Sequence, residues 1–143
     1  MSDAEAVVDR LMAALNDRDL EAVVRCYSPK AVAVGPQGVA EGRDEIAAYH
    51  AQVWEAFPKV SGMIWKKNTF DDLVVVELSS TVTHTGPFLL PSGEMLEPTG
   101  RSTSMRSCWV FTVEDDLVAT QRVYFDQWEL YSQLGAKLHS PEV

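Results

Sequence analysis

The spacing of apolar residues changes once along this chain, and the change limits the folds that it can adopt. Up to about residue 57, apolar residues recur every three or four positions, which is typical of amphipathic helices. From residue 59 onward, apolar and polar residues alternate, which is typical of strands. Helices followed by strands favour an α+β domain, with the helices packed on one face of a mostly antiparallel sheet.

The same spacing predicts the individual elements. Helices are expected after a capping pair at Ser2 and Glu5, after Asp19, and from Gly42 to residue 57. Strands are expected at 31–34, 59–70, 73–85, 101–113 and 117–126, with a short amphipathic tail at 127–135. Three prolines and three glycines make residues 86–100 a long loop or a loose hairpin tip.

Composition and charge narrow the classes of function. The chain has 143 residues, 46% of them hydrophobic and 23% charged, so residues 1–143 are expected to form a single globular domain. A net charge of −9 disfavours nucleic acid and anionic membranes as partners. The polar start of the chain and the lack of a long apolar run predict a cytoplasmic protein.

Metal and cofactor motifs are not apparent in the sequence. The three histidines lie far apart, and Cys26 and Cys108 have no metal-ligand spacing, so we expect two free thiols and no metal site. No glycine-rich phosphate loop follows a strand, and no nucleophile elbow occurs. Chemistry without a cofactor is the resulting expectation.

The strand at 73–85 places one histidine in the interior. Every second residue from Val75 is mostly polar, so the alternate set, which begins at Val74 and ends at His84, should face the core. A histidine there could shuttle protons near neutral pH. The alternative is a hydrogen-bonded core residue. His50, at the edge of its helix face, is a weaker candidate, and His139 lies in the tail.

The last strand carries three polar residues in alternation. Arg122, Tyr124 and Asp126 share one face, and Val123 and Phe125 share the other. Alternation does not show which face is inside. If the polar set faces solvent, these three residues have no catalytic role. If it faces a pocket, burial would raise the pKa of Asp126 toward neutral pH and allow proton transfer, and Arg122 could orient a substrate oxygen.

Several segments together resemble a known family. They read VVDRLMAALNDRDLEAVVRCYSPKAV, GRDEIAAYHAQVWEAFPKV, THTGPF, PTGR and YFDQWELYSQLG. In this order and spacing they resemble the SnoaL-like polyketide cyclases, within the nuclear-transport-factor-2-like superfamily. The resemblance covers about residues 4–135. It implies a cone-like α+β barrel, in which a strongly curved sheet and three N-terminal helices enclose a pocket, and it implies a homodimer.

The resemblance also implies an activity. The type reaction is an intramolecular aldol ring closure on a hydrophobic polyketide-like substrate, without a cofactor, and the matching general acid/base is Asp126. It favours Arg122 and Tyr124 inside the pocket, where they or His84 would bind the oxyanion. The expected substrate-binding residues are His50, Trp54, Trp65, Phe88, Trp109 and Phe111. For Trp54, Trp65, Trp109 and Phe111, the alternative is an ordinary place in the core.

Departures from related families leave alternatives open. Leu11, Trp109 and Gly35 stand where ketosteroid isomerases carry their polar catalytic residues, so that reaction is disfavoured. Epoxide hydrolases of this fold use two inward aspartates, and a second one is not evident beside Asp126. Three hypotheses remain: a cyclase, another pocket enzyme such as an isomerase, dehydratase or hydrolase, and a small-molecule binder without catalysis. Phe88 to Leu90 could form a lid over the pocket or an ordinary exposed loop.

Overall fold

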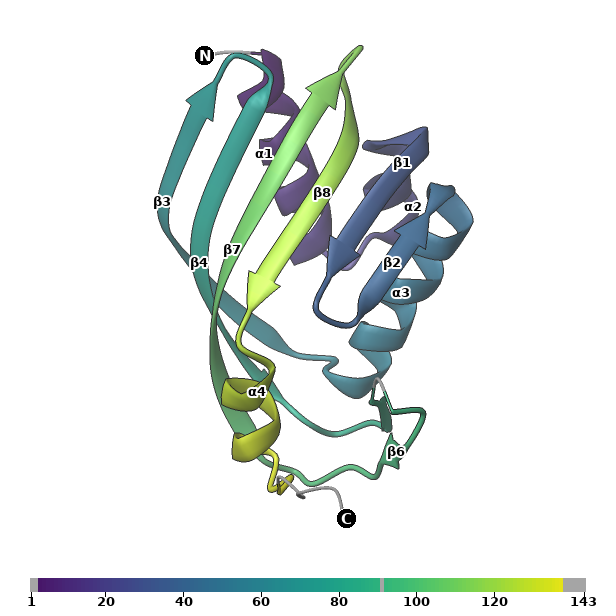
Figure 1. Ribbon diagram of the computed structural model, residues 1–143, viewed down its shortest axis with the longest axis vertical. Coiled ribbons are helices and arrows are strands. Elements are labelled where there is room, and N and C mark those ends of the chain that lie inside the picture. The colour runs from purple at the N-terminus through teal and green to yellow at the C-terminus, as the bar shows by residue number, and fades with distance from the viewer. Residues whose placement is uncertain (1–2, 91, 138–143) are drawn as a thin grey trace, which may run out of the picture.

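The computed structural model describes residues 3–90 and 92–137. Helices and strands follow one another in the order expected for an α+β fold (Figure 1). The helices are α1 (Asp3–Asn16), α2 (Leu20–Arg25), α3 (Gly42–Ala56) and α4 (Gln127–Gln133). The strands are β1 (Tyr27–Gly35), β2 (Gly38–Glu41), β3 (Val60–Phe70), β4 (Leu73–Thr83), β5 (Phe88–Leu89), β6 (Met95–Leu96), β7 (Ser102–Glu114) and β8 (Leu117–Phe125).

Six of the strands form one bent sheet in the order β2-β1-β8-β7-β4-β3. Only the pairing of β1 with β8 is parallel, and the other neighbours are antiparallel. Helices α1, α2 and α3 lie against one face of the curved sheet (Figure 1). The α+β class, the antiparallel character and the cone-like curvature are therefore confirmed, although the sheet does not close into a barrel.

The main core lies between α1 and the middle of the sheet. Val8 and Leu11 of α1 are fully buried, as are Val74 and Val76 of β4, and Phe111 of β7 faces the same interior opposite Val74. Burying a side chain of this size stabilises the fold by about 1.5–3 kcal/mol. The predicted inward set of β4 is confirmed, and His84, which continues it, is completely buried.

Two local elements differ from the expectation, and a third shows which of two alternatives holds. Tyr27, expected on the second helix, begins β1 and pairs with Val118 of β8, because α2 ends at Arg25. The short strand β2 folds back on β1 through the Pro36–Gln37 turn. The loop at 86–100 contains the two-stranded β5–β6 hairpin. Ser2 and His139 lie outside the described residues.

The last strand has the opposite orientation to the one that the family resemblance favoured. Opposite residues of paired strands share a face, and Val123 pairs with Trp109 while Phe125 pairs with Ser107, both on the helix-covered face. Arg122 and Tyr124 therefore point to the other face, where Tyr124 is 55% exposed. Asp126 is exposed just beyond the strand. The prediction that Arg122, Tyr124 and Asp126 face the interior is wrong.

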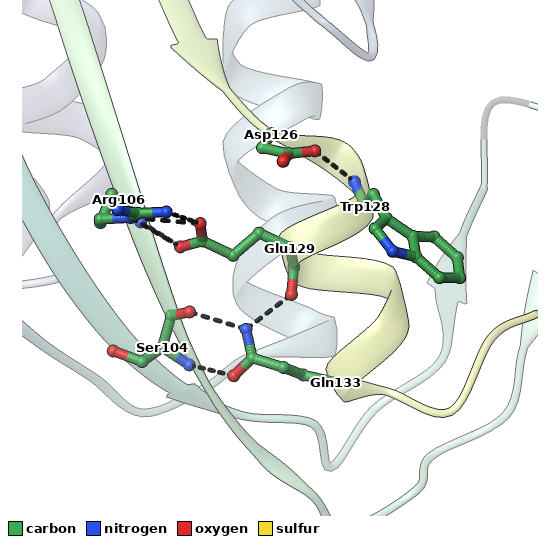
Figure 2. A network of polar contacts seen from close by, with 6 residues as sticks. All are labelled: Ser104, Arg106, Asp126, Trp128, Glu129 and Gln133. Atoms are coloured by element: carbon green, nitrogen blue, oxygen red, sulfur yellow. Dashed lines mark hydrogen bonds and ion pairs between the residues drawn. The ribbon is translucent and has the colours of Figure 1, made fainter.

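Asp126 instead begins the helix α4. Its carboxylate accepts a hydrogen bond from the backbone N–H of Trp128 at 2.9 Å, which is the interaction of a helix N-cap (Figure 2). A first-turn N–H of the helix is thereby satisfied. The position of Asp126 is thus explained by local structure.

Helix α4 completes the edge of β7 beyond the point where β8 ends (Figure 2). The side-chain amide of Gln133 accepts from Ser104 N and donates to Ser104 O, both at 2.8 Å. One turn earlier in α4, Glu129 accepts from the backbone N–H of Arg106 at 3.0 Å and pairs with its guanidinium at 2.7 Å. Two helix side chains thus take the place of a neighbouring strand.

This arrangement predicts a difference between two substitutions at Asp126. Asp126→Ala removes the cap and should lower the free energy of unfolding by about 0.5–2 kcal/mol. Asp126→Asn keeps a capping oxygen, and asparagine and aspartate are similarly good N-caps, so its effect should be small. Urea unfolding of both variants checks this. Equal losses in the two variants would show that the charge, not the cap, is what matters.

A second prediction concerns Gly86, which packs against the end of α3. Its N–H and that of Thr85 both donate to Ala56 O at 3.1 Å, and a Cβ at Gly86 would lie 1.9 Å from Glu55 O. Because the backbone of α3 at Glu55 would have to move to make room, Gly86→Ala should destabilise the protein by about 1–3 kcal/mol or more.

The matched control for that prediction is Gly62→Ala in β3. Its Cβ would meet Ser79 O at an ordinary 3.6 Å. Chemical denaturation of the two variants side by side provides the measurement. A stable Gly86→Ala protein would mean that the contact with α3 is not tight in solution.

Candidate functional site

Two neighbouring cavities open between α3 and the strands that face it. The inner cavity, of about 290 Å³, lies between α3, the β1–β2 hairpin and β8. The hairpin cavity, of about 270 Å³, lies between α3 and residues 88–90 and 93. The inner cavity is lined by Ala33, Val34, Gly35, Gln37, Gly38, Val39, Ala40, Glu45, Ile46, Ala48, Tyr49, His50, Gln52, Gln121 and Val123. The hairpin cavity is lined by Gln37, Tyr49, Gln52, Val53, Phe88, Leu89, Leu90 and Gly93.

His50 is the titratable group set deepest in the inner cavity. It lies on the buried side of α3, is 8% exposed, and is surrounded by the rings of Tyr27, Tyr49 and Trp54 at centroid distances of 5.4–6.3 Å. No hydrogen bond reaches its ring nitrogens from residues 3–90 or 92–137. Burial, with a contribution from the charge of Arg18, lowers the pKa of His50 to about 4. The imidazole is therefore neutral at pH 7, and one ring nitrogen can accept a proton.

Gln121 is the second polar group of this cavity, and Tyr27 holds it in place. The buried hydroxyl of Tyr27 on β1 donates a short hydrogen bond to Oε1 of Gln121 on β8. Burial raises the pKa of Tyr27 well above its usual value, so the hydroxyl stays protonated as the donor. With Oε1 occupied, the NH₂ group of Gln121 has no protein partner among the described residues. It is available as a hydrogen-bond donor to a ligand.

Arg18 and Trp54 form the layer behind His50. The Arg18 guanidinium lies 5.1 Å from the Trp54 ring centre and donates to Phe57 O at 2.9 Å, at the C-terminal end of α3. The contact with the Trp54 ring and the hydrogen bond to Phe57 O stabilise the charge of Arg18 where it is partly buried. Trp54, predicted to bind substrate, packs against the core and contacts His50.

His84 lies in a separate cluster under the β5–β6 hairpin. Its Nδ1 accepts from the backbone N–H of Thr99 at 3.2 Å and lies 3.0 Å from the hydroxyl of Thr99. Its ring packs against Phe57 and Phe88. Burial lowers the pKa of His84, so the neutral form prevails, with the proton on Nε2. His84 is inward as predicted, but it lines neither of the two cavities.

The other predicted substrate-binding residues divide into two groups. His50 lines the inner cavity and Phe88 the hairpin cavity. Trp109 and Phe111 pack edge to face with centroids 6.3 Å apart inside the core. Trp65 is 53% exposed at a bulge in β3 and lines neither cavity.

Gln121 and Tyr27 were missed by sequence reasoning. Gln121 belongs to the same alternating set as Val123 and Phe125. If the strand is placed with that set inside, Gln121 is recognised as a buried polar residue. Its bond to Tyr27 joins residues 94 positions apart, and no local pattern reports such a contact.

Residues 3–90 and 92–137 show neither a group of potential metal ligands nor a helix suited to span a membrane. Within them, no three histidine, cysteine or acidic residues are grouped so that they could hold a metal ion. No described helix has the length and hydropathy that a membrane span requires.

The chemistry available in the inner cavity is proton transfer beside a hydrogen-bond donor. A neutral imidazole can accept a proton, and the amide of Gln121 can donate to an oxygen that gains negative charge. The walls are more apolar than polar, as is usual for a site that binds a small molecule.

Comparison with solved structures shows proteins of the same fold. A protein assigned as a SnoaL-like polyketide cyclase from Jannaschia sp. CCS1 has a TM-score of 0.83 and 22% identity, covering 95% of this chain and 94% of its own. IdmH from Streptomyces antibioticus, assigned as a polyketide cyclase, has a TM-score of 0.76 and 23% identity, covering 93% and 99%. An LEH-like epoxide hydrolase from M. tuberculosis has a TM-score of 0.70 and 16% identity, covering 92% and 89%.

Sequence comparison identifies the family. No curated protein matches the chain significantly. The SnoaL-like domain family, in contrast, matches residues 8–121, which include α2, α3 and most of the strands that form the inner cavity. The chain therefore belongs to the SnoaL-like domain family.

Proposed function

We propose that this protein is a cofactor-independent cyclase that closes a ring on a neutral, apolar small molecule with two carbonyl groups. The observation that carries the proposal is the inner cavity, where the neutral imidazole of His50 and the amide of Gln121 face a common space with mostly apolar walls. The SnoaL-like family and the neighbouring structures assigned as polyketide cyclases support this class of reaction.

The proposed reaction is an intramolecular aldol addition. A ring nitrogen of His50 takes the proton from a carbon next to one carbonyl group, and the resulting enolate carbon bonds to the carbon of the second carbonyl group. The oxygen of that carbonyl gains the negative charge and accepts a hydrogen bond from Gln121. It then takes the proton back from His50, so that the product is an isomer of the substrate and the enzyme is unchanged.

Tyr27 acts in this proposal as a positioning residue. It is completely buried and contacts Gln121, not the cavity surface. By occupying Oε1 it directs the donor end of the amide toward the ligand. The cavity walls add a further effect, because a flexible chain held in one reactive shape avoids much of the entropic cost of ring closure.

Asp126 does not enter this mechanism. It is exposed, caps α4 and lines neither cavity. Among the described residues that line the inner cavity, Glu45 is the one carboxylate, and its Oε1 accepts from the backbone N–H of Glu41 at 3.1 Å. A reaction that needs two carboxylates around a water is therefore less well supported than proton transfer through His50.

One observation favours a second candidate function, which is ligand binding without turnover. A histidine whose pKa lies near 4 is a weak base for a proton attached to carbon. Such a site could still bind a neutral carbonyl compound through Gln121. Binding of substrate analogues together with no ring closure would identify this second function.

The cyclase proposal predicts that two substitutions abolish turnover. With linear poly-β-ketone thioesters of N-acetylcysteamine as probes, His50→Gln should lose most activity because the base is gone. Gln121→Leu should lower the rate constant about 10²- to 10³-fold, as loss of an oxyanion donor does elsewhere. Chromatography with mass detection measures the isomeric ring product.

Asp126→Asn is the control for these two variants, because it preserves the cap of α4. We expect it to keep most of the activity. Loss of turnover in Asp126→Asn, combined with normal turnover in His50→Gln, would assign the acid/base role to Asp126 and contradict the proposal.

The buried neutral state of His50 predicts a pH dependence of stability. Its folded pKa of about 4 lies below the usual 6.5, so the unfolded state binds the proton first as the pH falls. Stability should therefore decline from about pH 6.5 toward pH 4, with a loss of about 2 kcal/mol from this group at pH 5. Urea unfolding at pH 7.5 and 5 should show a smaller decline for His50→Gln than for the wild type. Identical declines would place His50 in solvent.

A further inference from the structure

The two cavities are joined by three residues that line both of them. Gln37 of the β1–β2 turn and Tyr49 and Gln52 of α3 each contribute to both the inner cavity and the hairpin cavity. A molecule in the inner cavity therefore lies next to the hairpin cavity, with only these side chains at the boundary. We call this boundary the neck.

The neck is closed by a weak contact. The Tyr49 hydroxyl lies 3.5 Å from Oε1 of Gln37, which is the outer limit of a hydrogen bond. Tyr49 is 38% exposed, and Gln37 lies in a two-residue turn at the sheet edge. Separating these two side chains costs little, so a ligand can extend from one cavity into the other.

Each cavity is slightly smaller than a usual small-molecule site, which favours a ligand that extends into both. Sites for small molecules usually measure about 300–1,000 Å³. The inner cavity of about 290 Å³ and the hairpin cavity of about 270 Å³ each fall just below this range. A substrate that closes its ring in the inner cavity and also carries a long apolar chain therefore needs room in both cavities.

The hairpin cavity has the walls of a site for an apolar group. Val53 from α3 and Phe88, Leu89 and Leu90 from the hairpin form its apolar side. Phe88 is 3% exposed and packs edge to face on Phe57 with centroids 5.1 Å apart. The core therefore holds Phe88 in place, and with it one side of the cavity.

Charge further restricts the occupant. Among the residues that the structure describes, none that lines the hairpin cavity is charged, and Glu45 is the one charged residue that lines the inner cavity. A free carboxylate or a phosphate would have no cation to pair with and would lie near an anion. The occupant is therefore a neutral molecule.

We propose that the substrate is a neutral, elongated molecule whose carbonyl groups lie in the inner cavity and whose apolar arm passes the neck of Gln37, Tyr49 and Gln52 into the hairpin cavity. The position of the carbonyl end rests on the proposed function. The position of the arm rests on the joined cavities, so the two parts can be tested separately.

The test uses a series of phenyl alkyl ketones, namely acetophenone, butyrophenone and hexanophenone. Dissociation constants are measured by calorimetry and by tryptophan fluorescence. For the wild type we expect the affinity to rise roughly two- to fourfold with each methylene that enters the hairpin cavity. In Val53→Phe and in Leu90→Phe, which fill that cavity, the gain should disappear while acetophenone binds as before.

The matched control is Val75→Phe, which adds the same ring on the outer face of β4. It should keep both the affinity for acetophenone and the gain per methylene. Circular dichroism shows which variants are folded, and either filled variant is sufficient if the other is not. An unchanged gain per methylene in a folded filled variant would overturn the assignment of the hairpin cavity.

Gln121→Leu separates this inference from the proposed function. If the carbonyl group binds Gln121, this variant should weaken all three ketones by the same factor. Equal binding of the ketones by wild type and Gln121→Leu would contradict the carbonyl site of the proposed function. The gain per methylene in that variant would still report on the hairpin cavity.

Discussion

Strand β7 extends past the end of its neighbour β8, and the fold depends on how its uncovered backbone is satisfied. The N–H groups of Ser104 and Arg106 would be unpaired at this edge, and Gln133 and Glu129 of α4 bind them. Because those two residues stand one helical turn apart, they match the two-residue repeat of the strand. The chain after β8 must therefore turn at once into a helix, and Asp126 begins it.

Helix α4 in turn supports the open end of the cone. Gln127 donates to Pro36 O at 3.3 Å in the β1–β2 turn and to the Tyr131 hydroxyl at 3.1 Å, and the Tyr131 ring packs near Phe88 with centroids 6.2 Å apart. The helix thereby ties the turn that carries Gln37 to the hairpin that carries Leu89. Figure 1 shows α4 and this hairpin at the same end of the molecule. The rim of the candidate site is thus held by a segment that contributes no side chain to either cavity.

The architecture was predictable from the sequence because it follows from periodicity, whereas the site was only partly so. In β4 one alternating set is mostly polar, so the buried side was clear and His84 was placed correctly. In β8 both sets are mixed, since Gln121 stands with Val123, and alternation defines two faces without saying which is inside. The family resemblance then favoured the wrong face. His50 was visible as a residue on a helix, but the partners that surround it come from distant strands.

The replacement of a strand by helix side chains has a consequence for how copies of this protein behave at high concentration. An uncovered strand edge can pair with the same edge of another molecule and start ordered aggregation. Once Glu129 and Gln133 occupy these backbone groups, a second chain has to displace a docked helix before it can add to β7. Helix α4 therefore protects this stretch of β7 against strand addition, besides holding the rim in shape.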